Sequence, residues 1–459
     1  MKSSLIDAPR QHDQDDLLGM NPYQDALIKF IKMADTPITI ALQGEWGSGK
    51  TSLMNMLRWN LCEAEGASYY PVWINTWQYS LLKTPNEAII SILEGIVNQI
   101  SEKSPKAKRS ENKKRLGGIL KTLATMGAKV AAGAVGVNGE VVDNLVGDSS
   151  TDSDINKLKK EIWKLIQESL SDDESKSGFI FFIDDLDRLD PPMAVEILEL
   201  LKNIFDLEKC IFILAIDYDV VIKGLKPRFG ELTKKNEREF RSFFDKIIQL
   251  PFTMPVASYN VNTFLMDALI RIGFFSKEEL KDLSLDEKLS EIARLSVGCN
   301  PRSLKRLTNT LSLLTIINTE KGLVSDSIDT KSKTLNFAFV CIQIAYPFLY
   351  DTLSEEPNFK LWNEHVAAKL KLRHMSDEEK ALLEADDEFN VEWESVVFRM
   401  CQEQIQHNDK ASQIAKLLSI IAEIVNDDDS LGEIVESKIA LSAVTNLKAR
   451  DDSSDDKND

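Results

Sequence analysis

The clearest pattern in the chain is a set of five short apolar runs upstream of residue 253. Their apolar residues are nearly continuous rather than alternating, which is typical of strands buried on both faces of a parallel sheet. Helix-like periodicity follows the first and third runs, over 52–63 and 193–207. Alternating strands and helices predict an α/β domain in which helices flank a parallel sheet. The five runs are 36–43, 70–75, 178–183, 210–216 and 246–252.

The rest of the chain departs from this alternation. The segment 78–177 separates the second and third runs and is too long for a simple connection, so we predict a helical, partly flexible insertion. From residue 261 onward the pattern is helical only. The tail 451–459 is too polar to pack and is expected to be disordered. The predicted domains are a core of 1–77 and 178–256, an insertion of 78–177, a helical lid of 257–320, a helical C-terminal domain of 321–450 and an acidic tail of 451–459.

The first apolar run leads into a glycine-rich segment that satisfies the pattern GxxxxGK[ST] and is followed at once by a helix pattern. In such a loop backbone N–H groups point inward around a phosphate, a curvature that side chains at the glycine positions would obstruct. We expect Lys50 to reach the β- and γ-phosphates of a nucleotide and Thr51 to ligate Mg²⁺. The alternative is a glycine-rich turn before a helix. The predicted phosphate-binding residues are Gly44, Glu45, Trp46, Gly47, Ser48, Gly49, Lys50, Thr51 and Ser52.

A pair of carboxylates follows the third apolar run. A phosphate loop needs a carboxylate on the metal side, best placed at the end of a neighbouring buried strand, and Asp184 stands there. Asp185, the next residue, is the candidate base that orients and polarises an attacking water. The alternative is that the pair caps the next helix, where Asp190 precedes Pro191.

Three further positions are candidates for contacts with a nucleotide. Asp217 follows the fourth run and is either a sensor of the γ-phosphate or the cap of the next helix. Arg302 lies in the first turn of a helix that Asn300 caps, and a cation there favours an external anion. We assign it to the nucleotide phosphates, the alternative being a solvated helix face. The stretch 16–20 either lays apolar side chains against an adenine or packs on the domain edge.

Charge and composition limit the classes of binding partner that we expect. A formal net charge of −18 disfavours general attraction to nucleic acid or anionic lipid. The basic run 106–115 leaves a nucleic-acid contact open but not favoured, because such runs are more often solvated. The Gly/Ala-rich stretch 116–147 is either a membrane contact or a mobile insertion. No secretory signal and no cysteine pattern stand out, so we expect a cytoplasmic protein, with peripheral association with the inner membrane as the alternative.

Six motifs, in this order, resemble the KAP family of P-loop NTPases, and they cover most of residues 10–320. Two features are especially specific, the Trp46-Gly47 pair and the doubled carboxylate. The motifs are GEWGSGKTS at 44–52, WINTWQYS at 73–80, FFIDDLDR at 181–188, FILAIDYDVV at 212–221, FFDKIIQLPF at 243–252 and NPRSLKRLTN at 300–309.

The resemblance implies an additional-strand (ASCE) P-loop fold with a helical lid, ATP as nucleotide, and the roles given above for Lys50, Thr51, Asp184 and Asp185. Many members carry membrane-spanning helices between the two Walker motifs, and bacterial members look like components of exclusion of phages and other mobile elements. This insertion departs from the family by being more polar and more interrupted than spanning helices are. Four further residues match the family's motifs, namely Asn75, Trp77, Lys246 and Gln249.

The leading hypothesis is a Mg²⁺-dependent ATPase that acts as a conformational switch, in which ATP draws the helix bearing Arg302 toward the phosphate loop. Absence of an Asn-Lys-x-Asp segment favours ATP over GTP. The alternatives are a nucleotide-gated assembly scaffold without hydrolysis and a nucleic-acid-associated motor. The expected partners are further copies of the chain or a protein of the same system, and in an oligomer Arg188 is a candidate arginine finger in trans.

Overall fold

The computed structural model describes residues 4–81, 83–105, 114–119, 149–204, 206–320, 329–376, 391–404, 406–427 and 429–442, with 108, 111, 389 and 445 as single positions. The chain divides into two compact units. We call Ala8–Pro255 the sheet unit, and Met1–Asp7 with Val256–Asp459 the helical unit. The domain boundaries predicted from the sequence remain predictions.

Five parallel strands form the centre of the sheet unit, in the order β2-β3-β4-β1-β5. Strand β4 lies between β1, which leads into the glycine-rich loop, and β3, which ends in the doubled carboxylate. That intervening strand defines the additional-strand class, so the predicted fold class is confirmed. The strands are β1 (Ile38–Gln43), β2 (Tyr69–Asn75), β3 (Gly178–Asp184), β4 (Cys210–Ile216) and β5 (Leu250–Thr253).

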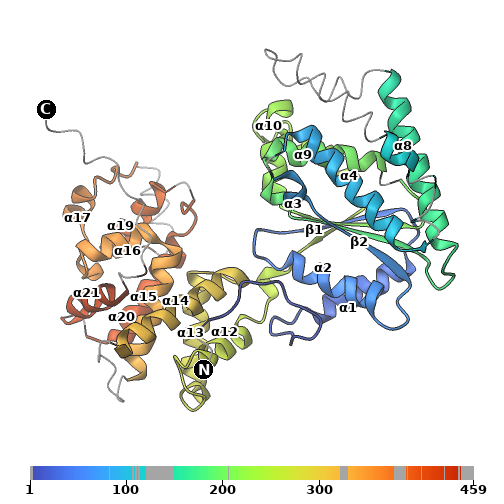
Figure 1. Cartoon of the computed structure of the whole chain (residues 1–459). Helices are drawn as coiled ribbons and strands as arrows, with labels where there is room; N and C mark the ends of the chain where they lie inside the picture. Colours follow the sequence, from blue (N-terminus) through green and yellow to red (C-terminus); the bar gives the residue numbers. More distant parts are fainter. Residues whose placement is uncertain are drawn as a thin grey trace, which may run out of the picture. The chain divides into compact units, whose positions relative to one another are not determined.

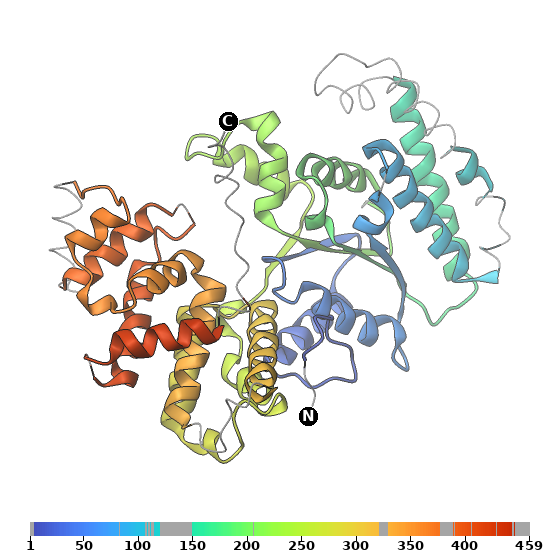
Figure 2. The ribbon, with the colours of Figure 1, turned by 60° about the vertical axis from the view of Figure 1, so that its left-hand side comes forward.

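Helices cover both faces of this sheet. Figure 1 shows α1 and α2 on one face and α4, α8 and α9 on the other, and Figure 2 shows the same layers after a turn of 60°. A segment of π-helix, Trp59–Glu63, extends α2. The helices are α1 (Asn21–Met33), α2 (Lys50–Arg58), α3 (Thr76–Ser80), α4 (Pro85–Glu102), α8 (Ser149–Leu170), α9 (Pro191–Ile204), α10 (Tyr218–Phe229) and α11 (Glu237–Asp245), with a 3-10 turn at Leu186–Arg188.

The hydrophobic core explains why the central strands read as continuous apolar runs. Every residue of β3 and β4 is buried, and Phe181 of β3 stacks on Phe212 of β4 with ring centroids 4.8 Å apart. Strands β2 and β5 lie at the edges of the sheet, and several of their residues are only partly buried. Burial on both faces therefore holds for the inner strands and not for the edges.

Helices α4 and α8, both from the segment predicted as an insertion, cover one face of the sheet. Apolar residues of the two helices, among them Ile92, Ile96, Leu165 and Ile166, belong to the same buried cluster as β2, β3 and β4. Residues 120–148, which hold most of the Gly/Ala-rich stretch, lie outside the described residues, as does most of the basic run 106–115. In the described ranges, none of the helices has the length and apolar character needed to cross a membrane.

One predicted strand begins later than its apolar run suggests. The run 246–252 was expected to be a buried strand, but 246–247 form a turn after α11, 248–249 are irregular, and β5 begins at Leu250. The backbone N–H groups of Ile247 and Ile248 donate to the carbonyl of Phe244, at 2.9 and 2.8 Å. Both side chains are buried, so their apolar character reflects burial beneath the turn and not strand pairing.

The helical unit contains helices and no strand among its described residues. Its central element is α15, whose residues Thr334, Leu335 and Phe337 to Gln343 are all buried, because α13, α14, α16, α20 and α21 pack around it. An all-helical C-terminal region was predicted and is confirmed for the described part. The helices are α12 (Val261–Arg271), α13 (Leu283–Leu295), α14 (Pro301–Glu320), α15 (Thr330–Ala345), α16 (Pro347–Glu355), α17 (Glu364–Lys369), α19 (Glu392–Gln402), α20 (Ala411–Val425) and α21 (Leu431–Ser442).

Candidate functional site

The loop between β1 and α2 has the backbone that its glycines permit. Gly47 and Gly49 have φ angles of 88° and 103°, in the left-handed region that side chains disfavour. At Gly44 an added Cβ would lie 2.7 Å from Ser48 Oγ and 3.2 Å from the side chain of Met254. The loop ends at the first turn of α2, where the free backbone N–H groups and the helix dipole favour an anion.

Lys50 is folded back over this loop. Its ammonium donates to the carbonyls of Gly44, at 2.7 Å, and Glu45, at 3.2 Å, and forms an ion pair of 2.8 Å with Asp187. Both side chains of the pair are nearly buried. The partner Asp187 was missed by the sequence reasoning, although it stands in the same DDLDR segment. It reaches Lys50 because the 3-10 turn Leu186–Arg188 carries it back toward the loop.

Thr51 and Asp184 come together between α2 and the end of β3. The Thr51 hydroxyl donates to Asp184 Oδ1 at 3.2 Å, and the backbone N–H of Asp185 donates to the same oxygen at 2.9 Å. Asp184 is only 4% exposed. Burial, followed by the negative charge of Asp185, raises the pKa of Asp184 to about 6. Two oxygen ligands predicted from the sequence therefore lie side by side, Thr51 Oγ1 and Asp184 Oδ1.

Asp185 points to other partners. Its backbone is left-handed, with φ of 60°, and its carboxylate accepts from Asn75 Nδ2 at 2.5 Å and from Arg188 Nε at 2.6 Å. Asn75 ends β2, opposite Asp184 in the strand register, and its Oδ1 also accepts from the N–H of Gln78 at 2.9 Å. The base candidate is thus held on both sides, by an amide and by a guanidinium.

Asp217 follows β4 and caps α10, where its side chain accepts from the backbone N–H of Asp219 at 3.1 Å. Burial raises the pKa of Asp217, whereas the positive charge of Lys50 lowers it. The carboxyl group therefore interacts electrostatically with the ammonium of Lys50. The expected helix cap is present. The sensor role of Asp217 stays a prediction.

Arg302 lies at the start of α14 in the helical unit. Its backbone N–H bonds Asn300 Oδ1 at 3.0 Å, which confirms the predicted cap, and its Nε forms an ion pair of 2.8 Å with Asp7. The predicted contact of Arg302 with a nucleotide stays a prediction.

The stretch 16–20 precedes α1 as expected, and Asp16 accepts from the N–H of Asn21 at 2.6 Å. The adenine contact of this stretch stays a prediction.

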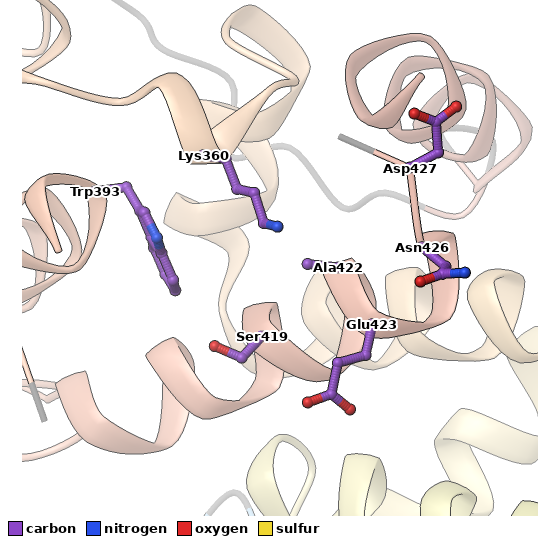
Figure 3. Close-up of a pocket in the computed structure, with 7 residues that line it drawn as sticks. All are labelled: Lys360, Trp393, Ser419, Ala422, Glu423, Asn426 and Asp427. Atoms are coloured by element: carbon purple, nitrogen blue, oxygen red, sulfur yellow. The ribbon is translucent and has the colours of Figure 1, made fainter. Parts of the chain in front are cut away.

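A separate pocket of about 570 Å³ lies in the helical unit and contains none of these residues. Figure 3 shows the Lys360 ammonium directed into the space between Trp393 and α20. Carboxylates of Glu423 and Asp427 also line it. Its open, mixed-charge lining favours no particular ligand.

Comparison with known proteins decides the class of the site. The family model described as KAP family P-loop domain matches residues 20–318. This chain belongs to the KAP family of P-loop NTPases. Family membership implies that the domain binds a nucleotide, usually with Mg²⁺. The assignment of this binding to the loop Gly44 to Thr51 and to the carboxylates after β3 stays a prediction.

Among the proteins similar to this KAP chain are a curated relative and a solved structure. The phage T7 exclusion protein of Escherichia coli (strain K12) is 25% identical over 238 residues, which cover 47% of this chain and 30% of that protein. The match thus spans less than a third of that relative's length. A solved structure of the Aeropyrum pernix ORC1 protein in complex with DNA aligns over 89% of this chain and 85% of that one, at 13% identity and a TM-score of 0.34.

The oxygen ligands of this KAP site fit Mg²⁺. Within the described ranges there is no group of three or more His, Cys, Asp or Glu side chains that could hold a metal ion. Mg²⁺ keeps several waters and binds through one or two protein oxygens together with substrate phosphates. Thr51 Oγ1 and Asp184 Oδ1 provide such oxygens beside the phosphate loop.

Proposed function

We propose that this KAP protein binds ATP with Mg²⁺ and hydrolyses it. The observation that carries the proposal is the grouping of Lys50, Thr51, Asp184 and Asp185 at one end of the sheet, around a loop whose backbone is shaped for a phosphate. Parallel α/β sheets bind their ligands at the carboxyl ends of the strands, where these residues stand.

Each residue has a defined task in the proposal. Lys50 exchanges the carbonyls of Gly44 and Glu45 for phosphate oxygens, while Thr51 and Asp184 hold Mg²⁺. Held by these two residues, Mg²⁺ would supply positive charge that offsets the charge developing on the phosphates. Asp185 orients the attacking water and accepts its proton. ATP is preferred over GTP on the absence of a guanine-recognition segment.

We further propose that hydrolysis drives a conformational switch, with Arg302 as the residue through which the helical unit senses the nucleotide. The name of the Escherichia coli relative supports a role in exclusion of phages or other mobile elements. Copies of this chain, or a protein of the same system, are the proposed partners. Co-purification at native levels with and without ATP, followed by mass determination, tests this.

A nucleotide-gated scaffold that does not hydrolyse ATP is the second candidate. It is favoured by the engagement of both oxygens of Asp185, by Asn75 and Arg188, which could keep that carboxylate from a water. Such a protein would bind ATP tightly and release no phosphate, even when its partner is added.

Steady-state phosphate release separates the two candidates. Asp185→Asn is expected to retain ATP binding and lose turnover by about 100-fold or more, the usual range for loss of a general base. Lys50→Ala is expected to lose both binding and turnover. Asp25→Asn, at an exposed carboxylate of α1, is the matched control. Full turnover by Asp185→Asn removes the base assignment, and absence of turnover in the wild type with intact binding favours the scaffold.

A further inference from the structure

Arg188 links three parts of the sheet unit. Its guanidinium carbon lies 5.7 Å from the ring centroid of Trp46 and 5.4 Å from that of Trp77, and its Nε pairs with Asp185 at 2.6 Å. Trp46 belongs to the phosphate loop and Trp77 to α3. The two indoles and the carboxylate thus meet at one cation.

The two indoles are unusually open to solvent for residues of their size. Trp46 is 59% exposed and Trp77 is 40% exposed. A single exposed apolar side chain needs no explanation, but these two indoles lie together at one cation. The Arg188 guanidinium explains their position. An indole face attracts a guanidinium more strongly than other aromatic rings do, and the planar guanidinium stacks well on the indole.

An ion pair at a partly exposed arginine contributes little when both side chains are mobile. Arg188 is 35% exposed, so its pair with Asp185 would be loose on its own. Contact with two rings restricts the guanidinium, and the restricted guanidinium in turn restricts the carboxylate. Asp185 needs such support because a residue other than glycine in the left-handed region is held there by its surroundings.

Trp46 connects this arrangement to the nucleotide loop. It lies between Glu45, whose carbonyl accepts from Lys50, and Gly47, whose φ is 88°. A rearrangement of the loop backbone around Glu45 and Gly47 would also move Trp46, which contacts Arg188.

We propose that Arg188 is a positioning residue for Asp185, and that Trp46 and Trp77 make its position depend on the state of the phosphate loop. This rests on the proposed function, since it takes Asp185 as the base. It differs from an arginine finger in trans, because Arg188 acts on a carboxylate of its own chain.

The first experiment separates turnover from affinity. Arg188→Ala is expected to lower kcat by about 10- to 100-fold, the cost of a misplaced catalytic group, and to leave the Kd for ATP within about threefold. Arg188→Lys restores part of kcat. Trp77→Phe keeps most of it, whereas Trp46→Ala lowers it. The double variant Trp46→Ala, Arg188→Ala is no slower than Arg188→Ala, because both act through one contact. Unchanged or higher kcat in Arg188→Ala, or additive losses in the double variant, would overturn the proposal.

A mixing test separates this proposal from a finger in trans. Arg188→Ala and Lys50→Ala chains are combined in equal amounts. A residue that acts within its own chain predicts no recovery of turnover, and recovery above the sum of the two separate variants contradicts it.

A final readout needs no hydrolysis. The fluorescence of Trp77 is isolated as the difference between wild type and Trp77→Phe, with ATP and Mg²⁺ added. We expect ATP to change this signal in the wild type and the change to disappear in Arg188→Ala. A change that persists in Arg188→Ala, or none in the wild type, overturns the coupling. A protein that binds ATP without hydrolysing it would still show the fluorescence change. Failure of the proposed hydrolysis can therefore be distinguished from failure of this inference.

Discussion

Lys50 and Asp187 form a nearly buried ion pair at 2.8 Å, in which the carboxylate holds the ammonium over the carbonyls of Gly44 and Glu45. A triphosphate would bring its own negative charge to the same ammonium. Asp187 is therefore the counter-charge of Lys50, and we expect the phosphates of a nucleotide to compete with it.

Asp187→Asn should lower the stability of the nucleotide-free protein and increase the stabilisation that ATP provides. Removing one partner of a buried ion pair costs about 3–5 kcal/mol, since the remaining buried charge loses its partner. Thermal melts are expected to show a lower Tm without nucleotide and a larger gain in Tm with Mg²⁺ and ATP than in the wild type. Asp25→Asn is the control, with no change in either quantity. A gain with ATP equal to that of the wild type would contradict this role.

Asp184→Asn should stabilise the nucleotide-free protein near pH 8 and abolish its response to Mg²⁺ with ATP. Burial and Asp185 raise the pKa of Asp184 from 3.8 to about 6, so the folded state holds this proton more tightly than the unfolded chain does. The contribution of Asp184 to the free energy of unfolding is therefore fully present below pH 3.8 and is lost as the pH rises through about 6. Replacing the carboxylate by an amide should raise the free energy of unfolding by at most about 3 kcal/mol at pH 8, and by close to nothing at pH 3.5.

Urea denaturation of wild type and Asp184→Asn at several pH values checks the sign. The difference in free energy of unfolding should grow between pH 4 and pH 7. A variant that is less stable than the wild type at pH 8 would contradict the unfavourable burial of the Asp184 carboxylate.

Gly44→Ala should remove nucleotide binding while the fold persists. A Cβ at this position would lie 2.7 Å from Ser48 Oγ and 3.2 Å from Met254, so the loop or its neighbours must shift. Calorimetric titration with ATP measures binding, and circular dichroism checks the fold. Gly117→Ala is the matched control, because a Cβ there meets nothing within 4 Å. Undiminished ATP affinity in Gly44→Ala would argue against a tightly shaped loop.

Asp7→Ala should raise the affinity for ATP if Arg302 contacts the nucleotide. The Asp7–Arg302 pair is partly exposed, so its loss is expected to change stability by less than about 1 kcal/mol. Arg302→Ala has the opposite effect on ATP affinity, and the double variant behaves like Arg302→Ala. Equal ATP affinity in the wild type and both single variants would remove Arg302 from the site.

The central part of the fold could be predicted because strands buried on both faces are continuous apolar runs in the sequence. Strands β3 and β4 are buried along their whole length, and 210–216 agrees in both bounds with the structure. The start of β5 could not be predicted, because Ile247 and Ile248 are apolar for packing beneath a turn and only the turn's hydrogen bonds distinguish that from pairing.

Contacts across the site were predictable where two motifs end at the same edge of the sheet, as for Thr51 and Asp184. Asp187 and Arg188 depend instead on a 3-10 turn of three residues, which turns one toward Lys50 and the other toward Trp46 and Trp77. No periodicity marks so short a turn. The spacing of DDLDR is the signal that could have suggested it.

The most direct test of the account is the melting temperature of the purified chain with ATP, in the presence and absence of Mg²⁺, for wild type and Lys50→Ala. A triphosphate gripped by the loop stabilises the folded state by mass action, by about 2.7 kcal/mol at one hundred times its Kd. We predict a rise in Tm that requires Mg²⁺ and is missing in Lys50→Ala. No rise in the wild type, or an equal rise in Lys50→Ala, would contradict nucleotide binding at this site.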